Sequence, residues 1–243
     1  MLKLGVNIDH VATLRELRGT PYPDVLAAAR VCRDAGAHGV TVHLREDRRH
    51  IRDADVRVLR AEPGLRLNLE MAIAPDVLAV ALETCPDEAC LVPERRQERT
   101  TEGGLDVLAN EAAVGTWVRR LSDGGVRVSL FIEPDPRQVE AAARVGAPCI
   151  ELHTGTLCTS TGAAAERELE RLVSAARQAA RLGLQVNAGH GINRGNLAAV
   201  LEIPHLDTLN IGHSIVCEAV FIGLDGAVRA MLTAMQAYRG GRP

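Results

Sequence analysis

Lysine is almost missing from this chain. Lys3 is the single lysine among 243 residues, so arginine supplies nearly all of the positive side-chain charge. This excludes an enzyme-borne lysine Schiff base at every strand end beyond the first, and it disfavours a lysine-tethered pyridoxal phosphate. Any amine needed for carbon–nitrogen chemistry has to come from a substrate. Phosphate groups have to be held by arginines, backbone amides and helix N-termini.

Aromatic side chains, basic excess and long apolar runs are also scarce. Aromatic residues make up 2% of the chain, which leaves few surfaces for base stacking. The formal net charge is −3, so the positive excess of nucleic-acid-binding proteins is missing. No apolar run approaches the roughly 18 residues of a membrane span. We therefore expect neither a nucleic-acid partner nor a membrane partner.

The six cysteines are scattered, and no two of them form a Cys-x-x-Cys pair. Free thiols in a reducing compartment are favoured over disulfides. The chain enters a strand-like run at Leu4, so no signal peptide is recognisable before it. These features predict a cytoplasmic protein.

Eight short apolar runs recur along the chain and alternate with alanine-rich segments of helical periodicity. The runs are Leu4–Asn7, Gly39–His43, Leu65–Glu70, Ala89–Val92, Val126–Ile132, Cys149–His153, Leu184–Asn187 and Thr208–Asn210. The expected helices are Asp24–Ala35, Asp53–Arg60, Pro75–Thr84, Asn110–Leu121, Pro136–Val145, Ala163–Leu182 and Asn196–Leu201. Long loops are expected over Asp9–Tyr22, Pro93–Asp106 and Thr154–Ala163.

Strand–helix alternation of this kind predicts a parallel sheet with right-handed crossovers. Eight repeats in a chain close to the roughly 250 residues typical of the fold favour an α/β protein, a (β/α)8 TIM barrel with extra short helices. An open doubly wound sheet is the alternative. We expect one domain over residues 1–243, with residues 239–243 as a flexible tail.

Residues capable of proton transfer lie at or just past the ends of the apolar runs. In a (β/α)8 barrel all strand ends meet at one mouth, where the active site lies. Glu70 leaves an apolar strand, which favours a raised pKa and a role as general base. His43 and Arg45 share a side of their strand, so a proton-transferring imidazole would lie beside a guanidinium suited to phosphate. Arg48 and Arg49 are expected to form a solvated charge run.

Two glycine–histidine turns follow the last two strands. One is Asn187-Ala188-Gly189-His190-Gly191, and the other is Asn210-Ile211-Gly212-His213-Ser214. Glycines allow backbone amides to approach an anion, and this position is the usual phosphate cradle of the fold. We expect Ser214 to cap a short helix running to about Phe221, with a further helix from about Asp225. Tight turns without a ligand are the alternative.

Glu151 and His153 form another carboxylate–histidine set, which in principle suits a metal. No His-x-x-x-His or similar compact ligand motif accompanies it. We therefore expect no metal and no cofactor.

Several long segments resemble the pyridoxine 5′-phosphate synthase (PdxJ) family. The resemblance runs from Gly5 to about Leu224. Its segments are GVNIDHVATLR with RGT, GVTVHLREDRRHI, LNLEMA, CLVPERRQERTTEGGLDV, VSLFIE, IELHTG, VNAGHG and LNIGH. The resemblance implies a barrel with extra helices that assembles as a homo-octamer. It also implies a transferase-type synthase that joins 3-amino-2-oxopropyl phosphate to 1-deoxy-D-xylulose 5-phosphate. The implied products are pyridoxine 5′-phosphate, inorganic phosphate and water.

The resemblance also implies roles for individual residues. His43 and Glu70 would accept protons, His190 would donate one, and Glu151 would stabilise a transition state. The residues implied for binding the aminoketone phosphate are Asn7, Arg18, Gly191, Gly212 and His213. Those implied for the deoxyxylulose phosphate are Asp9, His10, Arg45, His50 and Thr100. Two other functions remain open: a sugar-phosphate isomerase with a single substrate, and a phosphometabolite-binding protein without catalysis.

Overall fold

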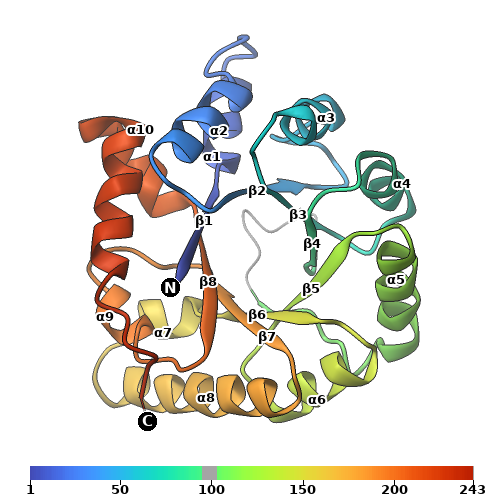
Figure 1. Cartoon of the computed structure of the whole chain (residues 1–243), viewed down its shortest axis with the longest axis vertical. Coiled ribbons are helices and arrows are strands. Elements are labelled where there is room, and N and C mark those ends of the chain that lie inside the picture. Colours follow the sequence, from blue (N-terminus) through green and yellow to red (C-terminus); the bar gives the residue numbers. More distant parts are fainter. Residues whose placement is uncertain (95–102, 243) are drawn as a thin grey trace.

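A closed parallel barrel forms the centre of the molecule in the computed structural model, which describes residues 1–94 and 103–242 (Figure 1). Neighbouring strands in the chain are neighbours in the barrel, and β1 pairs with β8 to close it. The strands are β1 (Lys3–Asn7), β2 (Gly39–Leu44), β3 (Leu67–Met71), β4 (Glu88–Leu91), β5 (Arg127–Ile132), β6 (Cys149–His153), β7 (Gln185–Gly189) and β8 (Leu206–Ile211).

Helices surround the barrel on its outer side (Figure 1). They are α1 (Asp9–Glu16), α2 (Val25–Asp34), α3 (Asp53–Ala61), α4 (Pro75–Thr84), α5 (Glu111–Asp123), α6 (Pro136–Arg144), α7 (Gly155–Thr159), α8 (Gly162–Arg181), α9 (Leu197–Val200) and α10 (His213–Met235). The predicted barrel is confirmed, and the pairing of β1 with β8 excludes the open sheet.

Two of the predicted long loops contain helices, so those predictions were wrong in part. In the first, α1 begins at Asp9 and buries Val11, Ala12 and Arg15, the i, i+1 and i+4 positions of one helix face. In the second, α7 and the first turn of α8 occupy residues 155–163. Neither segment was recognised as a helix because both are short and polar. In short helices, tertiary packing can override a weak local propensity. Part of the third loop, Pro93–Asp106, lies outside the described residues.

The strands turn an apolar face toward the helices, and many of their positions facing the barrel interior are polar. In β2, Val40, Val42 and Leu44 alternate with Thr41 and His43, and all five are buried. Several interior positions of the other strands are polar as well: the buried set includes Ser129, Glu151, Asn187 and Asn210. Bulky branched side chains usually fill this space. Here hydrogen-bonding groups occupy much of it, next to a small apolar cluster of Cys90, Val92 and Phe131.

The helix after β8 has a break in the middle. Gly223 has φ +76° and interrupts α10, so the predicted division between Phe221 and Asp225 is confirmed. The predicted capping by Ser214 is wrong, because Gly212 is the N-cap and the Ser214 hydroxyl donates to Ile192 O at 2.7 Å. Val220, Phe221 and Ile222 precede the break and are exposed.

The last described residues of the chain return to the barrel wall. Arg242 forms ion pairs with Glu166 and Glu202, and its backbone amide donates to Glu202 O at 2.8 Å. The six thiols are free, as predicted. Among the described residues, no helix has both the length and the apolar character needed to cross a membrane.

A buried ion pair ties α1 to α3 beneath the mouth of the barrel. Arg15 Nη1 and Nη2 donate to Asp55 Oδ1 and Oδ2 at 2.7 and 2.8 Å, and Nη2 also donates to His50 O at 2.8 Å. Removing one partner of a buried pair leaves an uncompensated charge. Asp55→Asn should therefore lower the free energy of unfolding by about 3 kcal/mol, measured by urea denaturation. Glu83→Gln, which breaks the exposed pair with Arg57, should change the free energy of unfolding far less, because exposed ion pairs contribute little. Equal losses in the two variants would contradict this.

Candidate active site

A cavity of about 610 Å³ opens at the carboxyl ends of the strands. It collects side chains from strand ends that are far apart in the sequence. The predicted site residues that line it are Asn7, Asp9, His10, His43, Arg45, His50, Glu70, Glu151, His190, Gly191, Gly212 and His213. Two predicted residues are not among them. Arg18 is exposed in the turn after α1 and does not line the cavity, and Thr100 lies outside the described residues.

His43 lies between two carboxyl groups. Strand register places His43 directly opposite Glu70, and His43 Nδ1 lies 4.0 Å from Glu70 Oε2. On the other side of the ring, Nε2 lies 2.9 Å from Glu94 Oε1. Burial opposes ionisation of Glu94, but its contact with His43 leaves the pKa of that carboxyl below its usual range. Glu94 therefore orients the ring, while the opposite nitrogen faces Glu70.

The carboxyl group of Glu70 is held in a strongly desolvated position. Burial raises the pKa of Glu70 well above its usual value, and the charges of Glu151 and Asp9 raise it further. An ionised carboxylate in such surroundings is a stronger base than one in water. The predicted rise in the pKa of Glu70 is thus present in the structure.

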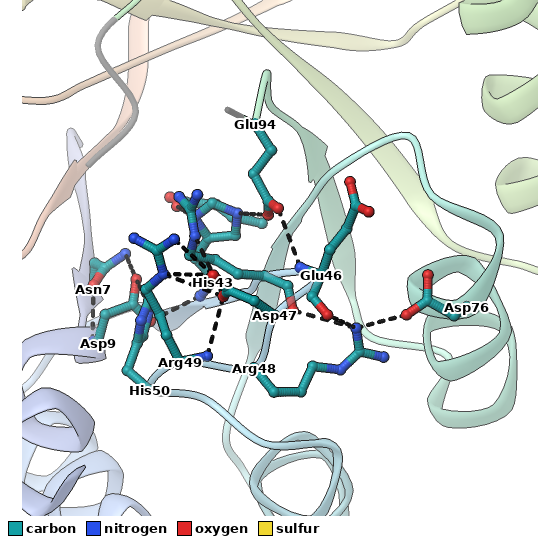
Figure 2. A network of polar contacts seen from close by, with 12 residues as sticks. Asn7, Asp9, His43, Glu46, Asp47, Arg48, Arg49, His50, Asp76 and Glu94 are labelled. Atoms are coloured by element: carbon teal, nitrogen blue, oxygen red, sulfur yellow. Dashed lines mark hydrogen bonds and ion pairs between the residues drawn. The ribbon is translucent and has the colours of Figure 1, made fainter. Parts of the chain in front are cut away.

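Asp9 links the ends of β1 and β2 and the loop that follows β2 (Figure 2). Its Oδ1 accepts from the backbone amide of His43 at 2.8 Å, and its Oδ2 accepts from Asn7 Nδ2 at 3.0 Å. His50 Nε2 lies 3.7 Å from Oδ2. Burial opposes ionisation, but His50 and His43 outweigh it and lower the pKa of Asp9. Asp9 thus remains a carboxylate and fixes the position of the β2 end.

Glu151 lies on β6 in the barrel interior, where its carboxyl group has almost no contact with solvent. Its side chain is buried, and Oε2 accepts from Asn210 Nδ2 at 2.5 Å. Burial raises the pKa of Glu151 to about 7, the hydrogen bond from Asn210 opposes that rise, and the charge of Glu88 adds to it. This carboxyl group therefore changes its protonation near neutral pH.

His190 lines the cavity, and its ring lies beside that of His153. The rings of His153 and His190 have centroids 5.1 Å apart, and His153 Nδ1 lies 2.8 Å from Glu133 Oε1. Burial lowers the pKa of His190 to about 4, and His153 contributes to that shift. His190 is therefore a neutral imidazole in the empty cavity, able to donate a hydrogen bond from one nitrogen.

The arginines after β2 divide into two groups. Arg45 is 2% exposed and lines the cavity. Arg48 binds Asp53 and Asp76, and Arg49 binds Asp47, mostly at the surface (Figure 2). Arg48 is only partly exposed and is held by the carboxylates of Asp53 and Asp76, so the prediction of a solvated charge run is confirmed for it only in part. Arg49 has the same kind of surface partner but also reaches the cavity lining.

Asp9, His43 and Glu70 are the one group of potential metal ligands found among the described residues, with ligand atoms within 4.8 Å of one another. Both oxygens of Asp9 already accept hydrogen bonds from His43 N and Asn7 Nδ2. The contacts within this group favour a hydrogen-bonded network. The absence of a metal stays a prediction.

Four residues near the cavity were not predicted as site residues. Glu94 and Glu133 were noted only as strand-end carboxylates, although each binds a cavity histidine. Asn210 and Thr154 were seen only as parts of turns. All four carried the same signal, a polar residue at or just past an apolar run, but nothing in the sequence distinguished Asn210 or Thr154 from an ordinary turn residue.

The fold and the site together define the class of protein, a (β/α)8 barrel enzyme whose polar groups lie at the strand ends. Phosphoribosyl anthranilate isomerase from Thermus thermophilus has the same fold, with a TM-score of 0.61, 16% identity, and coverage of 98% of this chain and 100% of that one. The tryptophan synthase A-subunit from Pyrococcus furiosus matches with a TM-score of 0.59, 13% identity, and coverage of 96% and 97%.

Sequence comparison is more specific than fold. Residues 4–237 match the family described as pyridoxal phosphate biosynthesis protein PdxJ, and the chain belongs to this family. A relative from Synechococcus sp. (strain JA-2-3B'a(2-13)), named pyridoxine 5′-phosphate synthase, is 55% identical over 236 residues. The match covers 97% of this chain and 99% of that relative.

The raised pKa of Glu151 predicts a pH-dependent loss of stability. The folded protein keeps a proton that the unfolded chain loses above pH 4.5, so stability should fall as pH rises from 4.5 to about 7. Glu151→Gln should flatten this fall, as measured by urea unfolding at pH 5 and pH 7. Glu170→Gln, at an exposed position of α8, serves as the control and should keep the wild-type slope. An unchanged slope in Glu151→Gln would show that this carboxyl is ionised throughout.

Proposed function

We propose that this chain is a pyridoxine 5′-phosphate synthase that condenses 3-amino-2-oxopropyl phosphate with 1-deoxy-D-xylulose 5-phosphate. The reaction is a ring-closing condensation of transferase type, and its products are pyridoxine 5′-phosphate, inorganic phosphate and water. The observation that carries the proposal is a single cavity in which proton-transfer groups lie between two different surroundings for phosphate. Family membership and the identity to a named synthase support it.

The two phosphate surroundings differ in chemistry. On one side, Gly191 and Gly212-His213 present backbone amides, and Gly212 is the N-cap of α10, whose dipole favours an anion. On the other side, Arg45 and His50 present cationic or hydrogen-bonding side chains. We assign the aminoketone phosphate to the first side, with Asn7, and the deoxyxylulose phosphate to the second, with Asp9 and His10.

Between the two sides, His43, Glu70 and Glu151 would carry the proton transfers. The substrate amine condenses with the ketone of the other substrate, which gives an imine and water. Glu70, helped by His43, removes a carbon-bound proton to form an enamine, and inorganic phosphate and water leave. Carbon attack on the second carbonyl then closes the ring, and a final dehydration gives the aromatic product. Glu151, which titrates near neutral pH, stabilises the charge that develops as the ring closes.

His190 is the proposed proton donor, and anion binding gives it that capacity. In the empty cavity its pKa of about 4 leaves it neutral, because it is buried and lies beside His153. A phosphate bound at the adjacent Gly191 places negative charge next to the ring, which favours the protonated form. The donor would then become charged only when substrate is bound.

We also propose the assembly and setting that the family resemblance implies. The chain would act as a cytoplasmic homo-octamer of single-domain subunits, without a cofactor. The exposed apolar residues Val220, Phe221 and Ile222 support self-association, because neighbouring exposed apolar side chains form a patch that favours contact with another surface.

Product formation tests the function directly. With both substrates present, the purified protein should release inorganic phosphate and form pyridoxine 5′-phosphate in equal amounts, measured by a phosphate assay and by chromatography. Each substrate alone should give neither product. A sugar-phosphate isomerase would convert one substrate without releasing phosphate, and a binding protein would release nothing.

Glu70→Gln tests the proposed base. The amide keeps the shape and hydrogen bonding of the carboxyl but cannot accept the proton, so turnover should fall by about 10²–10⁴. Binding of both substrates should change little, as measured by calorimetry. Glu46→Gln, on the exposed loop after β2, should keep wild-type turnover. Near-normal turnover in folded Glu70→Gln would leave His43 as the principal base.

A further inference from the structure

The turn after β7 has an unusual backbone. His190 has φ +79°, and Gly191 follows with φ +76°. Glycine adopts this left-handed region freely, whereas a residue with a side chain is strained there. Such strain persists only where the surroundings determine the conformation. The contacts around this turn therefore show what keeps His190 in place.

Thr154, the residue after β6, makes those contacts. Its side chain is fully buried, and its hydroxyl lies 2.7 Å from both Gly189 O and His190 O. The single hydroxyl proton is shared between the two carbonyl oxygens. The backbone amide of Thr154 also donates to Gly189 O, at 2.9 Å. Two donors of one residue thus hold the two peptide groups around the strained position.

Two further side chains continue this pattern. Asn196 Nδ2 donates to Gly191 O at 3.0 Å, and Ser214 Oγ donates to Ile192 O at 2.7 Å. Four successive carbonyls, from Gly189 to Ile192, are therefore held by side chains outside the turn. Because the N–H of a trans peptide points opposite to its C=O, the amides of Gly191 and Ile192 point away from these donors.

Those two amides face a cavity suited to an anion. Among the described residues, neither Gly191 N nor Ile192 N donates to a protein acceptor, and both residues line the cavity with His190. Successive free amides in a left-handed turn form a concave anion site. The packing behind the turn is tight as well, since a Cβ on Gly155 would lie 2.9 Å from the His190 ring.

We propose that Thr154 is a positioning residue for the proposed reaction. Its hydroxyl holds residues 189–192 in the conformation that aims the His190 ring and the Gly191 and Ile192 amides at one bound phosphate. The proposal rests on the proposed function for its link to turnover. Its link to phosphate binding stands on the geometry of the turn alone. Thr154 itself touches no substrate.

Thr154→Val tests the proposal, because valine keeps the shape of threonine and removes the hydroxyl. Affinity for inorganic phosphate, measured by calorimetry, should fall about tenfold, the size of one net hydrogen bond. The turnover number should fall about ten- to a hundredfold, since a small displacement of the donor is costly. Thr154→Ser restores the hydroxyl and should bring phosphate affinity back to within about twofold of wild type.

Thr84→Val is the matched control. The Thr84 hydroxyl also donates to a backbone carbonyl, Val80 O at 2.7 Å, but it lies in α4 and away from the cavity. Its loss should leave phosphate affinity and turnover unchanged. A general loss of stability would instead affect both threonine variants alike, which thermal unfolding followed by circular dichroism records.

Asn196→Ala provides a second test that leaves the buried strand end intact. It removes the donor to Gly191 O and should weaken phosphate binding in the same direction, even where Thr154→Val fails to fold. Wild-type phosphate affinity in folded Thr154→Val, or equal losses in Thr154→Val and Thr154→Ser, would overturn the proposal. If wild type binds phosphate but forms no product, the proposed function fails, and the phosphate measurements still decide the role of Thr154.

Discussion

The parallel register of the closed barrel is the constraint on which the site depends. Residues paired across two strands face the same side, so one register decides which side chains meet inside. This register sets His43 opposite Glu70 and Gly189 opposite Asn210. A slip of one residue in any strand would turn its polar side chains toward the helices and its apolar side chains into the cavity. The apolar outer face therefore specifies the catalytic inner face.

The polar barrel interior stabilises the fold less than an apolar interior would, but it supplies ionisable groups. Glu70, Glu151 and Glu88 are three carboxyl groups in or near the interior, and burial raises the pKa of each. Their amide partners, such as Asn210 for Glu151 and Asn187 for Glu88, satisfy only part of the lost hydration. An apolar interior would stabilise the fold more. The polar one supplies carboxyl groups that hold their protons more tightly than in water, and Glu151, with a pKa of about 7, exchanges its proton near neutral pH.

Much of the fold could be predicted from the sequence, because apolar runs and alanine-rich segments report burial directly. Glu70 and His190 were also predictable, since each follows an apolar run, and the barrel brings all strand ends together. Arg18 was predicted from resemblance alone, and within one chain it lies away from the cavity. Thr154 was not predictable, because its role depends on carbonyls that lie 35 and 36 residues away. Long-range hydrogen bonds of small side chains leave no local pattern.

Closure of the barrel joins the first strand of the chain to the last. Lys3 lies 3.1 Å from Asp207, and β1 pairs with β8 along residues 3–6. At about 5–20 residues per second, a ribosome takes on the order of ten seconds or more to deliver β8 after β1. During that interval one edge of β1 has no partner, and exposed edges invite pairing with other chains. A nascent chain of this protein therefore keeps an exposed sheet edge until β8 emerges, and loss of that strand would leave β1 with one partner strand instead of two.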